Sequence, residues 1–156
     1  MGRWCTPLPR FGLAVACALF VFASPVEAQP AAAAGVVKNV AGTAVVVHGG
    51  QELQAAPGQP IAEGDTVRTG ADGRLGITLK DGTRLSLGKD SELRVDTFLY
   101  DPAQRRLGVV LKLLRGITEY VSGRIAQLAP GAVKVETPTS VIGVRGTRLL
   151  IGVGTL

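Results

Sequence analysis

Apolar and polar side chains alternate in short runs along most of the chain, and glycine or an Asp-Gly pair separates one run from the next. Alternation with a period of two is typical of strands that bury one face. No window keeps the i, i+3, i+4, i+7 spacing of an amphipathic helix. The pattern predicts an all-β fold with strands at residues 35–39, 42–48, 66–69, 74–79, 83–87, 92–95, 107–113, 116–121, 132–136 and 146–153.

Glycines mark the expected turns, because glycine adopts a positive φ without a side-chain clash. The predicted turns are Gly49-Gly50, Gly58, Gly64-Asp65, Asp72-Gly73 and Asp81-Gly82. Residues 105–126 are ambiguous, since their Leu-Lys-Leu-Leu-Arg segment can also form a helical turn. Gly108 and Gly116 each lower helix propensity by about 1 kcal/mol, which favours strands here.

Apolar residues also recur with a longer period. Ile77, Leu85 and Leu93 are eight residues apart, and three further apolar residues follow two positions later. This spacing predicts apolar side chains in register on successive strands, as in a short twisted β-solenoid. A sandwich-like domain of short strands gives similar spacing, because its strands recur about every 8 to 12 residues. The period alone leaves both architectures open.

The first 28 residues have the composition of a secretory signal peptide. Two arginines precede an apolar stretch at residues 11–23, and Val-Glu-Ala at residues 26–28 offers a small-residue cleavage site. The stretch is shorter than the roughly 20 residues of a membrane-spanning helix. We therefore predict cleavage after Ala28 and a periplasmic location, with no membrane span after cleavage. A retained anchor, or a lipoprotein attached through Cys17, is the alternative.

Cleavage defines the expected domain organisation. Residues 29–35 are Ala-rich and form a flexible leader, and residues 36–156 form one β domain. The remaining 128 residues contain no cysteine and carry a formal net charge of +4. This length is sufficient for a single hydrophobic core, which must stabilise the domain without disulfides.

No catalytic, cofactor-binding or metal-binding residue is predicted. His48 is the only histidine, and the mature chain lacks cysteine, so three or four His and Cys ligands for zinc are not available in one chain. No Gly-x-Ser-x-Gly motif accompanies His48, which we expect to be an ordinary surface residue. The sequence therefore predicts a protein without enzymatic activity. A hydrolase that depends on His48 or on an acidic pair is the alternative.

Charged residues at the turns and on the strands also need an interpretation. The aspartates in or beside predicted turns are Asp65, Asp72, Asp81 and Asp90. We expect them to bond to backbone amides rather than to calcium, since the Gly-Gly-x-Gly-x-Asp repeat of calcium-binding β-helices is absent. The basic residues are scattered, and only Phe98, Tyr100 and Tyr120 are aromatic after the signal peptide. These features argue against a nucleic-acid partner, and they leave a solvated basic face or contact with anionic envelope polymers.

Four short motifs follow one another along the chain. They are Gly42 with Val45 and Val47; Gly64-Asp65-Thr66-Val67 with Thr69; Asp81-Gly82-Thr83 with Leu85; and Thr137-Pro138 with Val144-Arg145-Gly146-Thr147. Each motif alone indicates only a turn. Their order over most of residues 36–153 resembles the FecR domain, named for ferric-citrate regulators of bacterial envelopes. The resemblance implies a twisted, solenoid-like β-fold.

The motif residues are expected to have structural roles, because none is catalytic in the family. Asp65 and Thr69 can bond backbone amides at tight corners, Pro138 fixes φ before the next strand, and Gly146 allows a close backbone approach. The candidate structural residues are Gly64, Asp65, Val67, Thr69, Asp81, Gly82, Thr83, Thr137, Pro138, Arg145, Gly146 and Thr147.

The resemblance also implies a function. FecR-type regulators combine a cytoplasmic anti-sigma segment, a membrane-spanning helix and this domain, which meets the signalling domain of an outer-membrane receptor. No cytoplasmic module precedes the cleavable segment here, so the anti-sigma activity is not transferred. We expect a non-enzymatic periplasmic binding module that is accessory to envelope sensing or signalling. A structural or glycan-binding component of the cell envelope is the alternative, because fold does not fix function.

The C-terminal segment departs from the family pattern, which usually continues past Gly-Thr-x-Phe through a further hairpin. Here Leu149 replaces the aromatic residue, and the sequence stops at Leu156. A last strand without its usual neighbour would expose backbone groups at a sheet edge. We expect Leu149, Ile151 and Val153 to form an edge that a protein partner or a second copy completes by strand pairing. Pairing with an earlier segment of the chain is the alternative.

Overall fold

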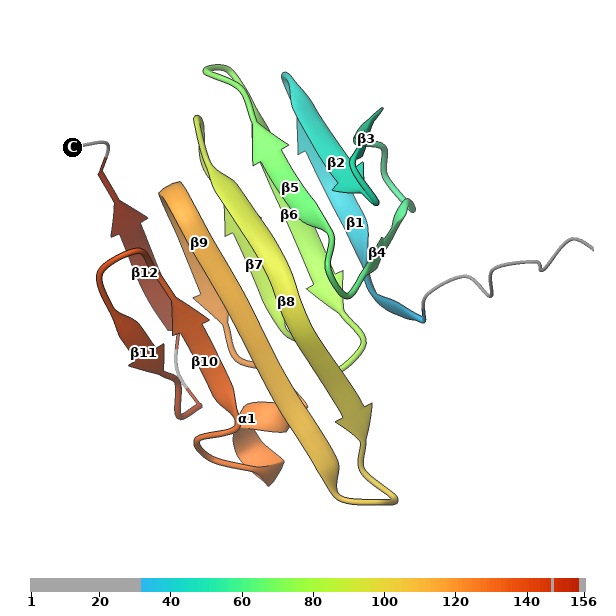
Figure 1. The fold of residues 1–156 in the computed structure, drawn as a ribbon, viewed down its shortest axis with the longest axis vertical. Coiled ribbons are helices and arrows are strands. Elements are labelled where there is room, and N and C mark those ends of the chain that lie inside the picture. The colour runs from blue at the N-terminus through green and yellow to red at the C-terminus, as the bar shows by residue number, and fades with distance from the viewer. Residues whose placement is uncertain (1–31, 147, 155–156) are drawn as a thin grey trace, which may run out of the picture.

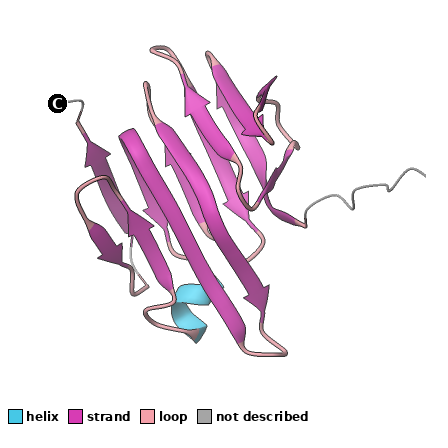
Figure 2. Cartoon of the chain, in the orientation of Figure 1, coloured by secondary structure: helices cyan, strands magenta, loops and turns pink. Residues whose placement is uncertain are grey.

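The computed structural model describes residues 32–146 and 148–154, so the predicted signal peptide and Thr147 lie outside the described residues. Nearly all regular structure is strand, which confirms the predicted all-β class (Figure 1, Figure 2). The elements are β1 (Ala33–Ala41), β2 (Ala44–His48), β3 (Gln51–Gln54), β4 (Pro60–Ala62), β5 (Thr66–Thr69), β6 (Arg74–Leu79), β7 (Arg84–Leu87), β8 (Glu92–Asp101), β9 (Arg106–Val121), α1 (Arg124–Leu128), β10 (Val133–Glu136), β11 (Val141–Gly143) and β12 (Arg148–Val153).

The strands form one curled sheet whose two arms face each other, and we call these arms layers 1 and 2. Layer 1 contains β3, β2, β5, β8, the first part of β9, β10 and β11, and it lies in front in Figure 1. Layer 2 contains β4, β1, β6, β7, the last part of β9 and β12. Among the strands of the described residues, β10 and β9 are the one parallel pair. Of the two predicted architectures, the sandwich-like one is closer, because neighbouring strands pair antiparallel instead of stacking as solenoid rungs.

The long strand β9 passes from one layer to the other at Gly116. Residues before Gly116 pair with β8, and residues from Gly116 onward pair with β7 and β12. Gly116 has a φ of +83°, and a Cβ at this position would lie 2.4 Å from the Cα of Ser91. Ser91 Oγ accepts the N–H of Ile117 at 3.0 Å. The two strands predicted for this region are therefore one strand of 16 residues with a bend fixed by glycine.

A single core fills the space between the layers. Its largest fully buried side chains come from both layers: Tyr120, Ile61, Leu75, Ile77, Leu79, Leu85, Leu93, Leu111, Leu113, Ile125, Val37 and Val46. The eight-residue period holds within one hairpin, where Ile77 lies opposite Leu85. It does not continue to Leu93, which lies in layer 1 opposite Leu113. The loop after β7 carries the chain across to the other layer, so the third residue of the period has a different neighbour.

The structure contains short elements that the pattern did not predict. β3 is exposed along its whole length and shows no alternation, while β4, β11 and α1 have only three to five residues. β1 begins at Ala33, before the predicted strand start at residue 35 and within the predicted flexible leader of residues 29–35. Ala34 is buried there, and its carbonyl accepts the N–H of Lys80 at 2.9 Å, so the end of the predicted leader is strand. Within residues 32–146 and 148–154, no helix has the length and hydropathy to cross a membrane.

Candidate functional site

Asp65 holds the turn between β4 and β5, and its side chain is almost fully buried. Its Oδ2 accepts the N–H of Ala62 at 2.8 Å, and its carbonyl accepts the N–H of Val95 at 2.9 Å. Its Oδ1 lies 2.6 Å from Nδ1 of His48. An ionised carboxylate can only accept a hydrogen bond, so Nδ1 of His48 carries the proton. Asp65 therefore ties together the end of β2, the β4–β5 turn and β8.

His48 differs from the ordinary surface residue that we expected. Its side chain is 57% exposed, but one ring nitrogen is held by the buried carboxylate of Asp65. The two residues are 17 positions apart, and the antiparallel pairing of β2 with β5 brings them together. Sequence reasoning missed this pair, although an alternating strand that ends in histidine opposite a Gly-Asp turn is the signal that could have indicated it.

Thr69, the last residue of the motif that begins at Gly64, joins β5 to the loop before β8. Its Oγ1 donates to the carbonyl of Gly88 at 2.6 Å and accepts the N–H of Ser91 at 2.9 Å. In the same motif, Gly64 has a φ of +89° and Val67 is fully buried in the core. These contacts of Thr69, Gly64 and Val67 shape the fold, as expected of structural residues.

The Asp81-Gly82-Thr83 turn anchors helix α1 to the β6–β7 hairpin. Asp81 is buried, and its carboxylate accepts the N–H of Thr83 at 3.0 Å, the hydroxyl of Thr83 at 2.8 Å and the N–H of Ile125 at 3.4 Å. Gly82 has a φ of +84°. Thr83 Oγ1 accepts the N–H of Gly123, directly before α1, at 3.1 Å. The turn thus fixes the segment that follows β9.

The closing motif lies in and after the β10–β11 hairpin. Thr137 forms the turn with Ser140, whose N–H donates to Thr137 Oγ1 at 3.0 Å, and Pro138 lies inside this turn. Arg145 and Gly146 are exposed, and Thr147 lies outside the described residues. The close backbone approach expected at Gly146 is wrong, because no atom lies within 4 Å of a Cβ there. Its φ of +62° is what requires glycine.

The strands β11 and β12 border a groove between the two layers at the C-terminal end of the sheet. The groove has a volume of about 520 Å³ and is lined by Leu114, residues 137–140, Ile142 and residues 151–154. Of the predicted edge residues, Ile151 and Val153 line this groove, while Leu149 does not. Leu149 lies opposite Tyr120 and packs against the core instead. The outward apolar residue of β12 is Leu150, which sequence reasoning did not single out and which is 71% exposed.

The backbone of β12 has one free edge. The carbonyl of Ile117 in β9 accepts the N–H of Gly88, in the loop after β7, at 2.9 Å, so Ile117 directs its backbone groups toward the β7 side of β9 and away from β12. Consecutive residues of an antiparallel strand alternate between its two sides. The N–H and C=O groups of Thr118 therefore point toward β12, where Ile151 lies opposite. Leu150 and Gly152, on either side of Ile151, have their N–H and C=O groups on the outer edge, where no strand of the described residues pairs with them.

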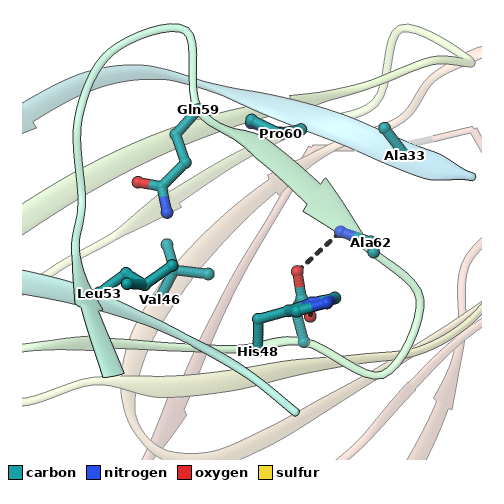
Figure 3. Close-up of a pocket in the computed structure, with 8 residues that line it drawn as sticks. Ala33, Val46, His48, Leu53, Gln59, Pro60 and Ala62 are labelled. Carbon is teal, nitrogen blue, oxygen red and sulfur yellow. Dashed lines mark hydrogen bonds and ion pairs between the residues drawn. The ribbon is translucent and has the colours of Figure 1, made fainter. Parts of the chain in front are cut away.

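A cavity of about 310 Å³ lies at the opposite end of the sheet, among β1, β2, β3 and β4 (Figure 3). Most of its wall is apolar, and its polar groups are Gln59 and the His48–Asp65 pair. In Figure 3 the Gln59 side chain descends from the start of β4 toward Val46, and the His48 ring lies across the cavity from it. The cavity and the groove are thus at different ends of the molecule.

The outer faces of the two layers carry different charge arrangements. On layer 1 the charges are paired across strands. Arg68 Nη1 lies 2.6 Å from Glu52 Oε1, and Lys112 Nζ lies 3.0 Å from Asp96 Oδ1. The carboxylate of Glu92 lies 3.2 Å from Nε of Arg68 and 3.2 Å from Nε of Arg115. The hydrogen bond with Asp96 raises the pKa of Lys112. On layer 2 Arg148 forms an ion pair with Glu119, whereas Lys38, Arg74 and Arg84 have no ion pair with a described residue.

No group of three or more His, Cys, Asp or Glu residues within the described ranges has an arrangement that could hold a metal ion. Comparison with protein-family models matches residues 65–155, more than half of the chain, to the family described as FecR protein. Comparison with curated proteins and with solved structures finds no match. The matched segment runs from β5 to the end of β12, and β1–β4 extend the same sheet before it.

Proposed function

Because this chain belongs to the FecR family, we propose that it is a non-enzymatic periplasmic interaction module, accessory to envelope sensing or signalling. The predicted signal peptide supports the periplasmic location. The match to the FecR family supports a role in envelope signalling. The module binds a protein partner, or a second copy of itself, by pairing a strand with β12.

The free edge of β12 is the observation that carries this proposal. The outer N–H and C=O groups of Leu150 and Gly152 can pair with an added strand without any change in the β12–β9 ladder. Leu150 adds an exposed apolar side chain beside them. A strand that pairs here places alternate side chains over the groove between β12 and the β10–β11 hairpin. Main-chain hydrogen bonds then supply affinity, and the groove supplies selectivity.

A proline substitution at Leu150 tests the pairing of the backbone. Proline lacks the N–H that an added strand needs, but proline is tolerated on edge strands where that N–H faces solvent. Leu150→Pro should therefore fold and lose the partner. The matched control is Leu150→Ala, which removes the exposed side chain but keeps the N–H.

The affinity-tagged wild-type chain and both variants are expressed in the native envelope, crosslinked mildly and purified in parallel. Retained proteins are identified by mass spectrometry, and self-association is measured by size-exclusion chromatography with light scattering. We expect a specific partner or a dimer with the wild type and Leu150→Ala, and its loss with Leu150→Pro. Equal retention by all three folded chains would contradict strand pairing at β12.

The cationic face of layer 2 favours a second candidate function, a structural or glycan-binding role in the envelope. Arg84 and Lys38 line one shallow hollow, and Arg84 and Arg148 line another, with Ser86 in both. Strands in a sheet are roughly 5 Å apart, so these cations lie along a row that an anionic polymer can follow.

A pair of charge reversals on opposite faces tests this candidate. Arg84→Glu changes the cationic face, whereas Arg94→Glu changes layer 1, where Arg94 lies 3.7 Å from Asp96. Binding to dextran sulfate is measured at low and high salt, with neutral dextran as the control polymer. A specific polymer site predicts loss of binding for Arg84→Glu alone, and equal weakening of both variants would indicate a response to net charge only.

A further inference from the structure

We propose that the cavity among β1, β2, β3 and β4 binds a small, mainly aliphatic molecule that carries one hydroxyl or carboxyl group. This site lies at the end of the sheet opposite to the groove beside β12, and it does not depend on the proposed partner binding (Figure 1). Nothing in the contacts of the FecR motifs requires such a cavity, since only Asp65 of those residues reaches it.

The walls of the cavity suit an aliphatic body. Val46 and Ala62 form part of the wall and are nearly inaccessible to solvent, and Leu53 forms another part from β3. Sites for small ligands are mostly apolar, with a few placed polar groups, and have volumes of roughly 300 to 1,000 Å³. The volume of about 310 Å³ lies at the lower end of that range, which restricts the occupant to a small molecule.

Gln59 presents a fixed donor to the cavity. Its Oε1 accepts the N–H of Ala56 at 3.0 Å, and this bond distinguishes the amide oxygen from the amide nitrogen. The NH₂ group is therefore the part of Gln59 that remains for a ligand, and the side chain points into the cavity in Figure 3. An oxygen of a hydroxyl or carboxyl group is the acceptor that matches this donor.

His48 supplies the second polar group. Its Nδ1 is occupied by Asp65 at 2.6 Å, and Asp65 is in turn held by the N–H of Ala62. The ring is thereby fixed in orientation and tautomer, and Nε2 is the nitrogen left for a ligand. Neutral Nε2 accepts from a hydroxyl group, and protonated Nε2 donates to a carboxylate. The hydroxyl or carboxyl group of a ligand can therefore bond to His48 or to Gln59, according to its orientation in the cavity.

The edge strands around the cavity favour a small molecule over a protein strand. β3 has only four residues, with Gln51, Glu52 and Gln54 among them, and β4 has three residues and begins with Pro60. Short length, charge and proline keep an edge strand from pairing with another chain. The cavity behind these two strands is therefore open to a ligand that needs no backbone pairing.

The test uses hexan-1-ol and hexanoate as separate probes, followed by backbone amide resonances of the full chain in solution. Leu53→Trp fills the mouth of the cavity, and Leu53 is 49% exposed, so the larger side chain can be accommodated without loss of the fold. Leu99→Trp is the matched control, because Leu99 is 42% exposed on β8 and does not line the cavity. Gln59→Glu keeps an oxygen for Ala56 but removes the NH₂ donor.

We expect at least one probe to shift the resonances of Val46, His48 and Ala62 in a saturable manner in the wild type and in Leu99→Trp. Leu53→Trp should abolish saturation, and Gln59→Glu should weaken binding roughly tenfold, as the loss of one hydrogen bond predicts. The stronger probe identifies the polar group. The proposal is wrong if neither probe gives saturable shifts, or if the folded Leu53→Trp chain binds as the wild type does.

Discussion

The edge strands at the two ends of the curled sheet differ in length and in composition. At the end that contains the cavity, β3 is short and polar, and β4 has three residues that begin with Pro60. At the other end, β12 continues after Arg148 with Leu, Leu, Ile, Gly and Val, and β11 consists of Val, Ile and Gly. Charges, proline and short length protect an edge from pairing with other chains. Charge, proline and short length thus protect β3 and β4, and short length alone protects β11, whereas β12 is longer and mostly apolar. We propose that a partner binds at β12.

The largest effect is expected from a change at the bend of β9, which joins the two layers. Gly116→Val places a β-branched side chain at a φ of +83° and against the backbone of Ser91, where β9 joins the two layers. Left-handed strain and overpacking together should lower the free energy of unfolding by roughly 3 to 5 kcal/mol. Urea denaturation followed by circular dichroism measures this loss.

Gly108→Val is the matched control for this substitution. Gly108 lies in the same strand, and the nearest atom to a Cβ there is the carbonyl oxygen of Ala132 at 4.0 Å. Valine is favoured in strands, so this variant should change stability by less than about 1 kcal/mol. Similar losses for the two variants would contradict a special role for the bend at Gly116.

A second prediction compares how much the β4–β5 turn and the β10–β11 turn, one at each end of the sheet, contribute to stability. Asp65→Ala leaves the buried N–H of Ala62 without its acceptor and frees His48, so it should cost roughly 2 to 3 kcal/mol. Thr137→Ala removes a hydrogen bond in the exposed β10–β11 turn and should cost about 0.5 to 1 kcal/mol. Urea denaturation of both variants measures the difference. Equal costs would show that the cavity end is not the more tightly bonded one.

Titration of Tyr120 tests the burial of a core side chain on β9, the strand with which β12 pairs. Tyr120 lies opposite Leu149 of β12, and burial raises the pKa of its hydroxyl above the ordinary value of 10.0. The unfolded chain loses this proton first, so the free energy of unfolding should fall as the pH rises above about 10. Tyr120→Phe should remove that part of the decrease. If both chains lose stability equally between about pH 9 and 11, the hydroxyl of Tyr120 is not buried in the core.

The smallest effect on stability is expected when a lysine is introduced into β12 or β11, the edge strands beside the groove. Leu150→Lys and Val141→Lys replace exposed side chains of β12 and β11, so each should change the free energy of unfolding by no more than about 0.5 kcal/mol. Light scattering and partner capture should nevertheless show weaker association, because an edge lysine opposes strand pairing. Unchanged association would indicate that the apolar edge is not the binding surface.

Much of the layer structure was predictable from alternation and turn chemistry. The strands at residues 66–69 and 74–79 have the predicted bounds, since glycine turns and buried alternate residues coincide there. The bend at Gly116 was not predictable, because it depends on the packing of Ser91 from a distant loop.

The candidate sites were predictable only in part. The C-terminal pattern predicted the last strand but left open whether an earlier segment pairs with it, and β9 does pair with one side of β12. Leu149 packs inward and Leu150 faces out, because pairing with β9 fixes which alternate residues face the core. The cavity was not anticipated. It needs β3, whose exposed residues give no periodic signal, and it needs the contact between His48 and Asp65, which arises from pairing across 17 residues.

Amide hydrogen exchange along β12 tests the central claim most directly. In the isolated chain, the N–H groups of Leu150 and Gly152 should exchange quickly at the free edge, while that of Ile151 should be protected by β9. After addition of the captured partner, or at a concentration at which the chain associates, Leu150 and Gly152 should become protected as well. Slow exchange of Leu150 and Gly152 in the isolated chain, or fast exchange that persists in the complex, would contradict a free edge that pairs with a partner strand.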